Sequence, residues 1–287
     1  MTYSVHTTFI DTYPSETDKK LPLGRNVRHD SRSRMYAFPT KGLTPLSVAH
    51  VRRIQILDQN LTGVGSCTAN AGLGALGCDP FYTAMGAGNA FKKAFPKGWT
   101  EDSATTLYSA ATKIDRFKGE YPPTDTGSDG LSVATVLKGW GLISGYQHTF
   151  SLDDMLRALS VTVGIIGINW YSSFDTPAKD GRVVIQSDAT IRGGHELLVR
   201  EVDVPNRLIW WDNSWGAVWG KAGRCCASFE TVERLLAEDG DFTVFCPPTA
   251  PAPIPSPVPT PIPAYTPADL VMYQAAKGWA YGRGIPA

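Results

Sequence analysis

A cysteine, a histidine and an asparagine in this chain have the types and the order that nucleophilic catalysis uses. Cys67 follows two glycines in residues 63–75, GVGSCTANAGLGA, where Ser66 as a cap and the alanine-rich run predict a helix that begins at the cysteine. The free N–H groups at a helix N-terminus favour a thiolate, so we expect a lowered pKa for this thiol. Far downstream come His195, able to hold the thiol proton, and Asn213, whose amide could orient the ring.

Three short segments make the chain resemble the papain-like family of cysteine peptidases. The nucleophile segment of that family is matched by GSCTANA, its histidine strand by GGHELLVREVD, and its asparagine segment by NSWGAVWGKAGRCC. They occur in the family's order, and the resemblance covers residues 47–246. Without a signal or propeptide pattern, the chain is more similar to bacterial or bacteriophage members than to lysosomal ones.

The resemblance implies a role for each matched residue. Cys67 would attack a peptide carbonyl, His195 would protonate the leaving amine, and Asn213 would orient the imidazole. Trp215 would shield the bond between histidine and asparagine, and Gly194 would let the backbone pass close to the site. Alone, each of these residues would more often be a core or turn residue, and only their combination favours a triad.

The chain departs from the family at the glutamine that helps to stabilise the oxyanion. Leu61 occupies its usual place, six residues before Cys67, whereas Gln59 lies eight residues before. The loop therefore looks two residues longer, and Gln59 can serve only if the extra residues bulge outward. Otherwise Gln59 is a turn residue. Thr68 stands where papain itself has tryptophan.

The helices and strands expected around these residues, together with the resemblance, predict an α+β, papain-like fold of two subdomains. The active site would lie in the cleft between the subdomains. In residues 47–150 we expect helices after Ser66, after the cap signals of Thr100, and over LSVATVLKGWGL, with Leu107 and Ile114 facing inward. In residues 151–246 a capping box at Ser151 predicts a short helix. A barrel-like antiparallel sheet is then expected from VTVGIIGINWYSSF, RVVIQS, HELLVREVD, RLIWWDN, RCCAS and DFTVFC.

The flanks differ from this domain in composition. Residues 1–46 contain an arginine-rich stretch and predict a solvated arm that wraps the domain, or an electrostatic patch; the segment is too short to resemble an inhibitory propeptide. His29 has no evident partner. Residues 247–265 predict a proline-rich linker, and residues 266–287 a helix that docks on a protein partner, on a second copy or back on its own domain.

Composition limits the remaining classes of function. The formal net charge is zero and 43% of residues are hydrophobic, which indicates a soluble globular protein with neither a nucleic-acid nor a membrane partner. The N-terminus lacks a signal-peptide pattern, so we expect a cytoplasmic or virion-associated protein. Five cysteines favour reduced buried thiols over a bridge from Cys225 or Cys226 to Cys246, and we expect neither a metal nor a cofactor.

The function expected from these residues is that of a papain-like cysteine endopeptidase. Its substrate would be a peptide or protein, hydrolysed through a thioester acyl-enzyme. Two alternatives remain open: an inactive papain-like binding module tethered by the proline-rich tail, and an amidase or transpeptidase that acts on cell-wall peptide.

Overall fold

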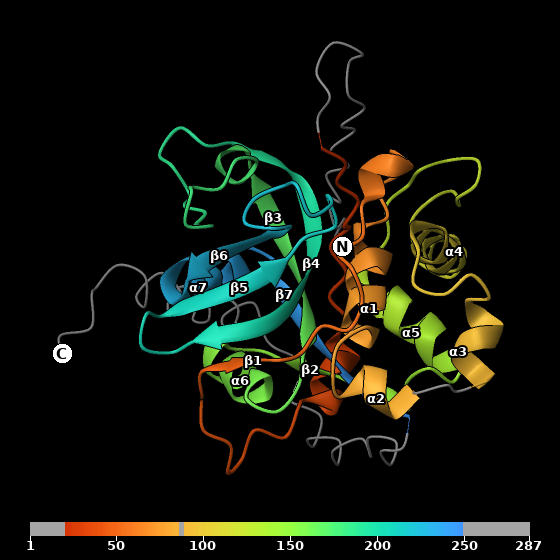
Figure 1. The fold of residues 1–287 in the computed structure, drawn as a ribbon, viewed down its shortest axis with the longest axis horizontal. Coiled ribbons are helices and arrows are strands. Elements are labelled where there is room, and N and C mark those ends of the chain that lie inside the picture. Colours follow the sequence, from red (N-terminus) through yellow and green to blue (C-terminus); the bar gives the residue numbers. More distant parts are fainter. Residues whose placement is uncertain (1–20, 86–88, 249–287) are drawn as a thin grey trace, which may run out of the picture. The chain divides into compact units, whose positions relative to one another are not determined.

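An antiparallel sheet carries the histidine and leads into the asparagine (Figure 1). The computed structural model describes residues 21–85 and 89–248. The order of the strands is β2-β7-β3-β4-β5-β6, and the two-residue β1 pairs with β4. The strands are β1 (Val48–Ala49), β2 (Gly145–Thr149), β3 (Gly164–Tyr171), β4 (Ile191–Asp203), β5 (Leu208–Asp212), β6 (Arg224–Ser228) and β7 (Asp241–Cys246).

Five helices precede most of the sheet and lie on one side of it, and two of them contact its strands (Figure 1). They are α1 (Cys67–Leu76), α2 (Phe81–Met85), α3 (Asn89–Ala94), α4 (Glu101–Thr112) and α5 (Gly130–Gly139). The other face is covered by α6 (Leu152–Leu159) and α7 (Phe229–Ala237). The expected α+β fold, with a helical half and an antiparallel half, is confirmed.

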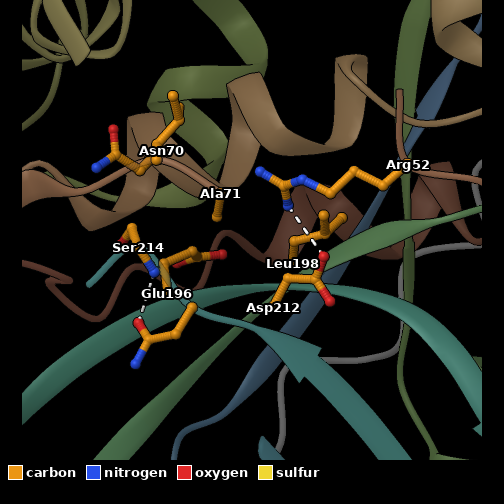
Figure 2. A pocket seen from close by; sticks show the side chains of 9 residues that line it. Arg52, Asn70, Ala71, Glu196, Leu198, Asp212 and Ser214 are labelled. Atoms are coloured by element: carbon orange, nitrogen blue, oxygen red, sulfur yellow. Dashed lines mark hydrogen bonds and ion pairs between the residues drawn. The ribbon is translucent and has the colours of Figure 1, made fainter. Parts of the chain in front are cut away.

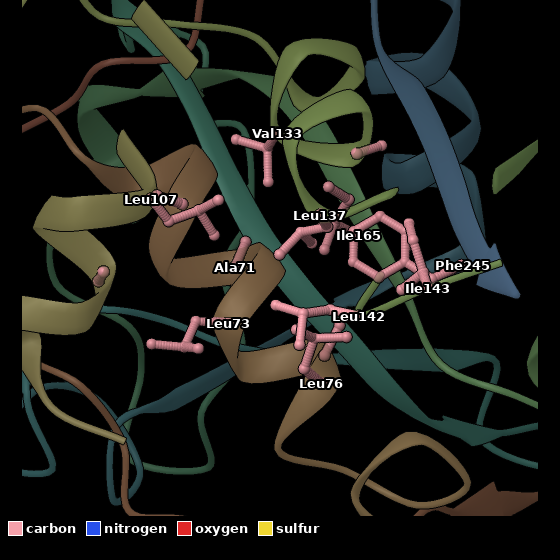
Figure 3. Packing of buried hydrophobic residues seen from close by; sticks show 14 of the residues in the cluster. Ala71, Leu73, Leu76, Leu107, Val133, Leu137, Leu142, Ile143, Ile165 and Phe245 are labelled. Atoms are coloured by element: carbon pink, nitrogen blue, oxygen red, sulfur yellow. The ribbon is translucent and has the colours of Figure 1, made fainter. Parts of the chain in front are cut away.

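Helix α1 is the centre of the helical half, and every one of its residues is buried. It packs against α4, α5 and β4. Figure 3 shows this core, in which Leu73 and Leu76 of α1 meet side chains of α4, α5 and the sheet. Gly72 permits the close approach of α5, because a Cβ there would lie 2.7 Å from Val133 Cγ1. Burial of this kind fixes the position of the residue that begins the helix.

Several expected elements are observed with their caps. The Thr100 hydroxyl accepts from the Ser103 N–H at the start of α4, and the Ser151 hydroxyl accepts from the Asp154 N–H at the start of α6. Leu107 is buried as expected.

Other expectations are wrong. RVVIQS, residues 182–187, forms no strand and makes only an isolated bridge to Cys226, while β2 and α7 were not foreseen. Strand β2 also lies on the helical side of the boundary expected at residue 150. Ile114 is 48% exposed because it lies beyond the end of α4. Ser66 occupies the N-cap position of α1, but its side chain makes no capping hydrogen bond.

The five cysteines are all reduced and buried, as the sequence favoured. A disulfide from Cys225 or Cys226 to Cys246 would need β6 and β7 to be neighbouring strands. They are not, because β7 pairs with β2 and β3.

The structure tests the expectations for the N-terminal flank from residue 21 onward, but not those for nearly all of the C-terminal flank. Residues 21–46 belong to the same compact unit as the sheet and helices. Residues 249–287, with nearly all of the expected linker and the whole expected C-terminal helix, lie outside the described residues. None of the described helices is long and apolar enough to cross a membrane.

Candidate active site

Cys67 is the first residue of α1 and has no exposed surface. Backbone N–H groups of Glu196, Gly24 and Thr68 lie near its sulfur and act to lower the pKa of the thiol. Because Glu196 directly follows His195, the start of α1 lies against the histidine strand.

His195 is held by the strand that follows it in the sheet. The pairing of β4 with β5 brings Asn213, just beyond β5, next to the ring, and His195 Nε2 lies 2.8 Å from Asn213 Oδ1. The Trp215 ring stacks on the imidazole at 4.8 Å with an interplanar angle of 25°, and Trp170 meets it edge-on at 4.9 Å. The ring is therefore fixed in orientation, while Nδ1 has no hydrogen-bond partner within the described residues.

Gln59 is buried beside this group, in a single 3₁₀ turn (Gln59–Leu61). Its Oε1 accepts a 2.8 Å hydrogen bond from Ser214 Oγ, which leaves its Nε2 to donate to the Pro22 carbonyl at 2.7 Å. Leu61 is 78% exposed, so the loop bulges outward at this residue. Gly63 closes this bulge at φ +68°, a conformation that glycine adopts readily.

The N-terminal arm runs through the site instead of lying in solvent. Pro22 O also accepts from Trp215 Nε1 at 3.0 Å, and the Arg25 N–H donates to Gly194 O at 3.0 Å. On the opposite side, Ser128 accepts from Asn26 and donates to Gly24 through backbone groups. We call residues 21–26 the covering segment, because Gly24 lies near the sulfur, while Pro22 and Arg25, on either side of Gly24 in the chain, contact Trp215 and Gly194. The expectation of a solvated arm is wrong for this segment.

Two glycines make this close contact fit. A Cβ on Gly24 would lie 1.8 Å from Gly65 O, and a Cβ on Gly194 would lie 2.1 Å from Arg25 O. Backbone atoms cannot yield as flexible side chains do. The covering segment is thus matched to the site by shape.

Burial makes the cysteine–histidine pair neutral in this state. It raises the pKa of Cys67 to about 12, although the backbone hydrogen bonds act in the opposite direction. Burial also lowers the pKa of His195 to about 4, against the influence of Asn213. The lowered thiol pKa that the helix N-terminus led us to expect is therefore wrong for the covered site, because desolvation outweighs the N–H groups.

Polar groups form the adjoining wall of the site. Figure 2 shows Asn70 and Ala71 of α1 facing Glu196, Leu198 and Asp212 of the sheet across a cavity of about 10 Å³. The Asn70 amide donates to Glu101 Oε1 at 3.1 Å, and burial raises the pKa of Glu101 to about 7. Within residues 21–85 and 89–248, no cluster of three His, Cys, Asp or Glu side chains could hold a metal ion.

Some residues of this site had no motif in the sequence. Ser214 and Asn70 hold Gln59. Arg25 forms a buried ion pair with Asp241, and the buried Glu196, which follows His195, lies close to the Arg25 guanidinium. The only signal was a glutamate inside the apolar run after His195, a residue type that is rarely buried without a partner.

The sequence matches no protein-family model and no curated protein. Among solved structures, a crystal structure of xylellain, a cysteine protease from Xylella fastidiosa, covers 82% of this chain and 99% of its own at 19% identity, with a TM-score of 0.58. The fold is that of the papain-like cysteine proteases. Less similar structures include procathepsin L 3 of Tenebrio molitor larval midgut, at 12% identity, 79% and 76% coverage and a TM-score of 0.46. Bromelain from Ananas comosus in complex with the E64 inhibitor has 14% identity, 69% and 99% coverage and a TM-score of 0.39.

At these identities the likeness concerns the papain-like fold alone. Any catalytic role of Cys67, His195, Asn213 and Gln59 therefore depends on the geometry of this chain.

Proposed function

We propose that the chain is a cysteine peptidase whose triad is Cys67, His195 and Asn213. The observation that carries this proposal is the His195–Asn213 pair, stacked under Trp215, together with a cysteine that begins a buried helix and lies near the backbone of Glu196, the residue after His195. A histidine oriented by a third group next to a thiol is the arrangement that activates a sulfur nucleophile.

In the proposed reaction His195 Nδ1 takes the thiol proton, and Cys67 Sγ forms a bond to the substrate carbonyl carbon. The C–N bond then breaks, and the imidazolium gives its proton to the leaving amine. A thioester remains, and His195 takes a proton from the water that hydrolyses it. Asn213 keeps the ring in position through its Oδ1.

The Cys67 N–H and Gln59 Nε2 would stabilise the oxyanion of the tetrahedral intermediate. Gln59 Nε2 already donates to a backbone carbonyl inside the site, that of Pro22, which supports this role. One such donor is worth about 3 to 4 kcal/mol in well-characterised enzymes.

Because Cys67 has no exposed surface, the covering segment must leave before a substrate reaches the sulfur. The proposal is therefore tested with Gly24→Ala, whose added Cβ would overlap Gly65 O and displace the segment without changing a triad residue. We expect an epoxysuccinyl thiol inhibitor to label Cys67 about tenfold or more faster in this variant than in the unaltered chain.

Mass spectrometry should locate the adduct on Cys67, and labelling of the variant should extend below pH 7 because a thiolate–imidazolium pair reacts there. Adding His195→Ala should abolish it. Labelling of Gly24→Ala that rises only near pH 8.5, as for an ordinary thiol, would overturn the peptidase and favour a binding module. Turnover of fluorogenic peptides then distinguishes a peptidase from an amidase of cell-wall peptide.

A further inference from the structure

Arg25 is a buried cation beside the catalytic histidine. Its N–H donates to Gly194 O, and Gly194 precedes His195 in β4. Its side chain is 1% exposed, and Nη2 donates both to the Asp241 carboxylate and to Asp239 O. The covering segment thus inserts one charged side chain into the protein at the triad.

The pocket that receives this side chain is acidic. Glu196 is buried there, and neither of its carboxylate oxygens has a hydrogen-bond partner within the described residues. Asp241 closes the pocket towards solvent, with a quarter of its side chain exposed. Gly167 of β3 provides the space, because a Cβ there would lie 2.5 Å from Arg25 Nε and 2.9 Å from Glu196 Oε2.

When the covering segment leaves, the pocket loses its cation. Arg25 is the residue that balances Glu196 and Asp241, and the nearby Asp129 is paired with Arg28, which follows closely on the same arm. Burial raises the pKa of Glu196 well above its usual range, whereas the Arg25 guanidinium acts to lower it, so a cation in the pocket favours the ionised carboxylate. The uncovered site therefore favours a ligand that returns a positive charge, and a guanidinium fits two carboxylates through its several N–H donors.

We propose that this acidic pocket, formed by Glu196 and Asp241, binds an arginine or lysine side chain of the substrate. The substrate class is then a peptide with a basic residue close to the scissile bond, and Arg25 holds the place of that residue while the site is covered. This inference rests on the proposed peptidase function.

The kinetic test uses the full chain with Gly24→Ala. Fluorogenic tetrapeptides carry arginine, lysine or norleucine at one position at a time. We expect kcat/KM for the best arginine or lysine peptide to exceed that of its norleucine match by about tenfold or more. Glu196→Gln and Asp241→Asn should each reduce this ratio, while Glu230→Gln, the same loss of charge at an exposed pair with Arg207, should leave it unchanged.

Asp241→Asn is the variant least able to disturb folding, since its side chain is partly exposed. Turnover that is no faster for arginine or lysine peptides than for norleucine peptides would overturn the pocket assignment. So would a basic preference that both variants retain. Neither result would count against the peptidase function.

A binding test separates the pocket from the chemistry. Fluorescein-labelled arginine and norleucine peptides are titrated into Gly24→Ala with Cys67→Ala, and anisotropy gives the two dissociation constants. Tighter arginine binding that Glu196→Gln and Asp241→Asn remove supports the pocket even if no peptide is turned over, and absent turnover then counts against the peptidase alone. Equal binding of the two peptides overturns the pocket, which would then be only the anchor of the arm.

Discussion

At the scale of single residues, Gln59 is the side chain whose role depends most on local geometry. Its Oε1 is held by Ser214 Oγ, so its Nε2 is directed at a carbonyl in the site. In the proposed reaction the same donor would meet the oxyanion, and preorganisation of this kind is what makes a donor effective in catalysis.

We therefore expect Gln59→Ala to lower kcat by about 100- to 1,000-fold, with a smaller effect on KM, because the bond strengthens in the transition state. Steady-state kinetics with a fluorogenic peptide in the Gly24→Ala chain measures both constants. Asn60→Ala, at the exposed neighbouring position, is the matched control. An equal loss in the two variants would mean that Gln59 acts only through the fold of its loop.

The order of cysteine, histidine and asparagine was readable from the sequence because each stands in a short segment of recognisable composition. Glu196 and Arg25 were not readable as a pair, because one lies in β4 and the other in the arm. Such charges are brought together only by tertiary contacts. A buried glutamate marks the presence of a partner but not its place in the chain.

At the scale of elements, Asp212 joins the strand that carries His195 to the strand that leads to Asn213. Its buried carboxylate accepts from Arg52, Arg200 and Arg224 at 2.8 to 3.0 Å, and Arg224 also reaches Glu201 on β4. Burial alone would raise the pKa of Asp212, but the three guanidinium groups together lower it. This network ties β4, β5 and β6 at the position from which Asn213 extends.

We expect Asp212→Asn to lower the free energy of unfolding by about 3 to 5 kcal/mol, because it leaves buried guanidinium groups without their carboxylate. Urea unfolding at pH 7 measures the change. Asp153→Asn, in an exposed pair with Arg157 on α6, should cost less than about 1 kcal/mol. Similar losses in the two variants would contradict a structural role for the network.

Local signals decided which elements could be foreseen. Thr100 and Ser151 mark α4 and α6 because a cap is a contact within one turn. RVVIQS has the composition of a strand but makes only one isolated bridge, to Cys226 of β6. Composition could not predict this, because strand pairing depends on segments that are distant in the sequence. The course of the covering segment was not readable for the same reason: many of its contacts are made by its own backbone groups, which carry no sequence pattern.

At the scale of the whole molecule, the buried His195 and the partly buried Glu101 act in opposite directions on the pH dependence of stability. The pKa of His195 lies near 4 in the fold, below its ordinary 6.5, so this group makes stability fall as the pH drops from 6.5 to 4. The pKa of Glu101 lies near 7, above its ordinary 4.5, so its contribution is complete below pH 4.5 and is lost as the pH rises to 7.

Glu101→Gln removes the contribution of the glutamate, so the pH dependence of the free energy of unfolding should then reflect His195. We expect the variant to be more stable than the unaltered chain by about 2 to 3 kcal/mol at pH 8 and by little at pH 4.5, because only the ionised glutamate is costly to bury. Free energies of unfolding at several pH values between 4.5 and 8 give the comparison. Glu233→Gln, the same change at an exposed position of α7, should shift stability equally little at every pH. A pH-independent gain in Glu101→Gln would refute the assignment.

The covering segment belongs to the same polypeptide as the site that it covers, so in the proposed function it would be a competitor that dilution cannot remove. Its local concentration is set by the chain and not by the amount of protein. If a fraction f of the unaltered molecules is uncovered, the apparent KM of the unaltered chain should be 1/f times that of Gly24→Ala. This ratio should be the same at every enzyme concentration.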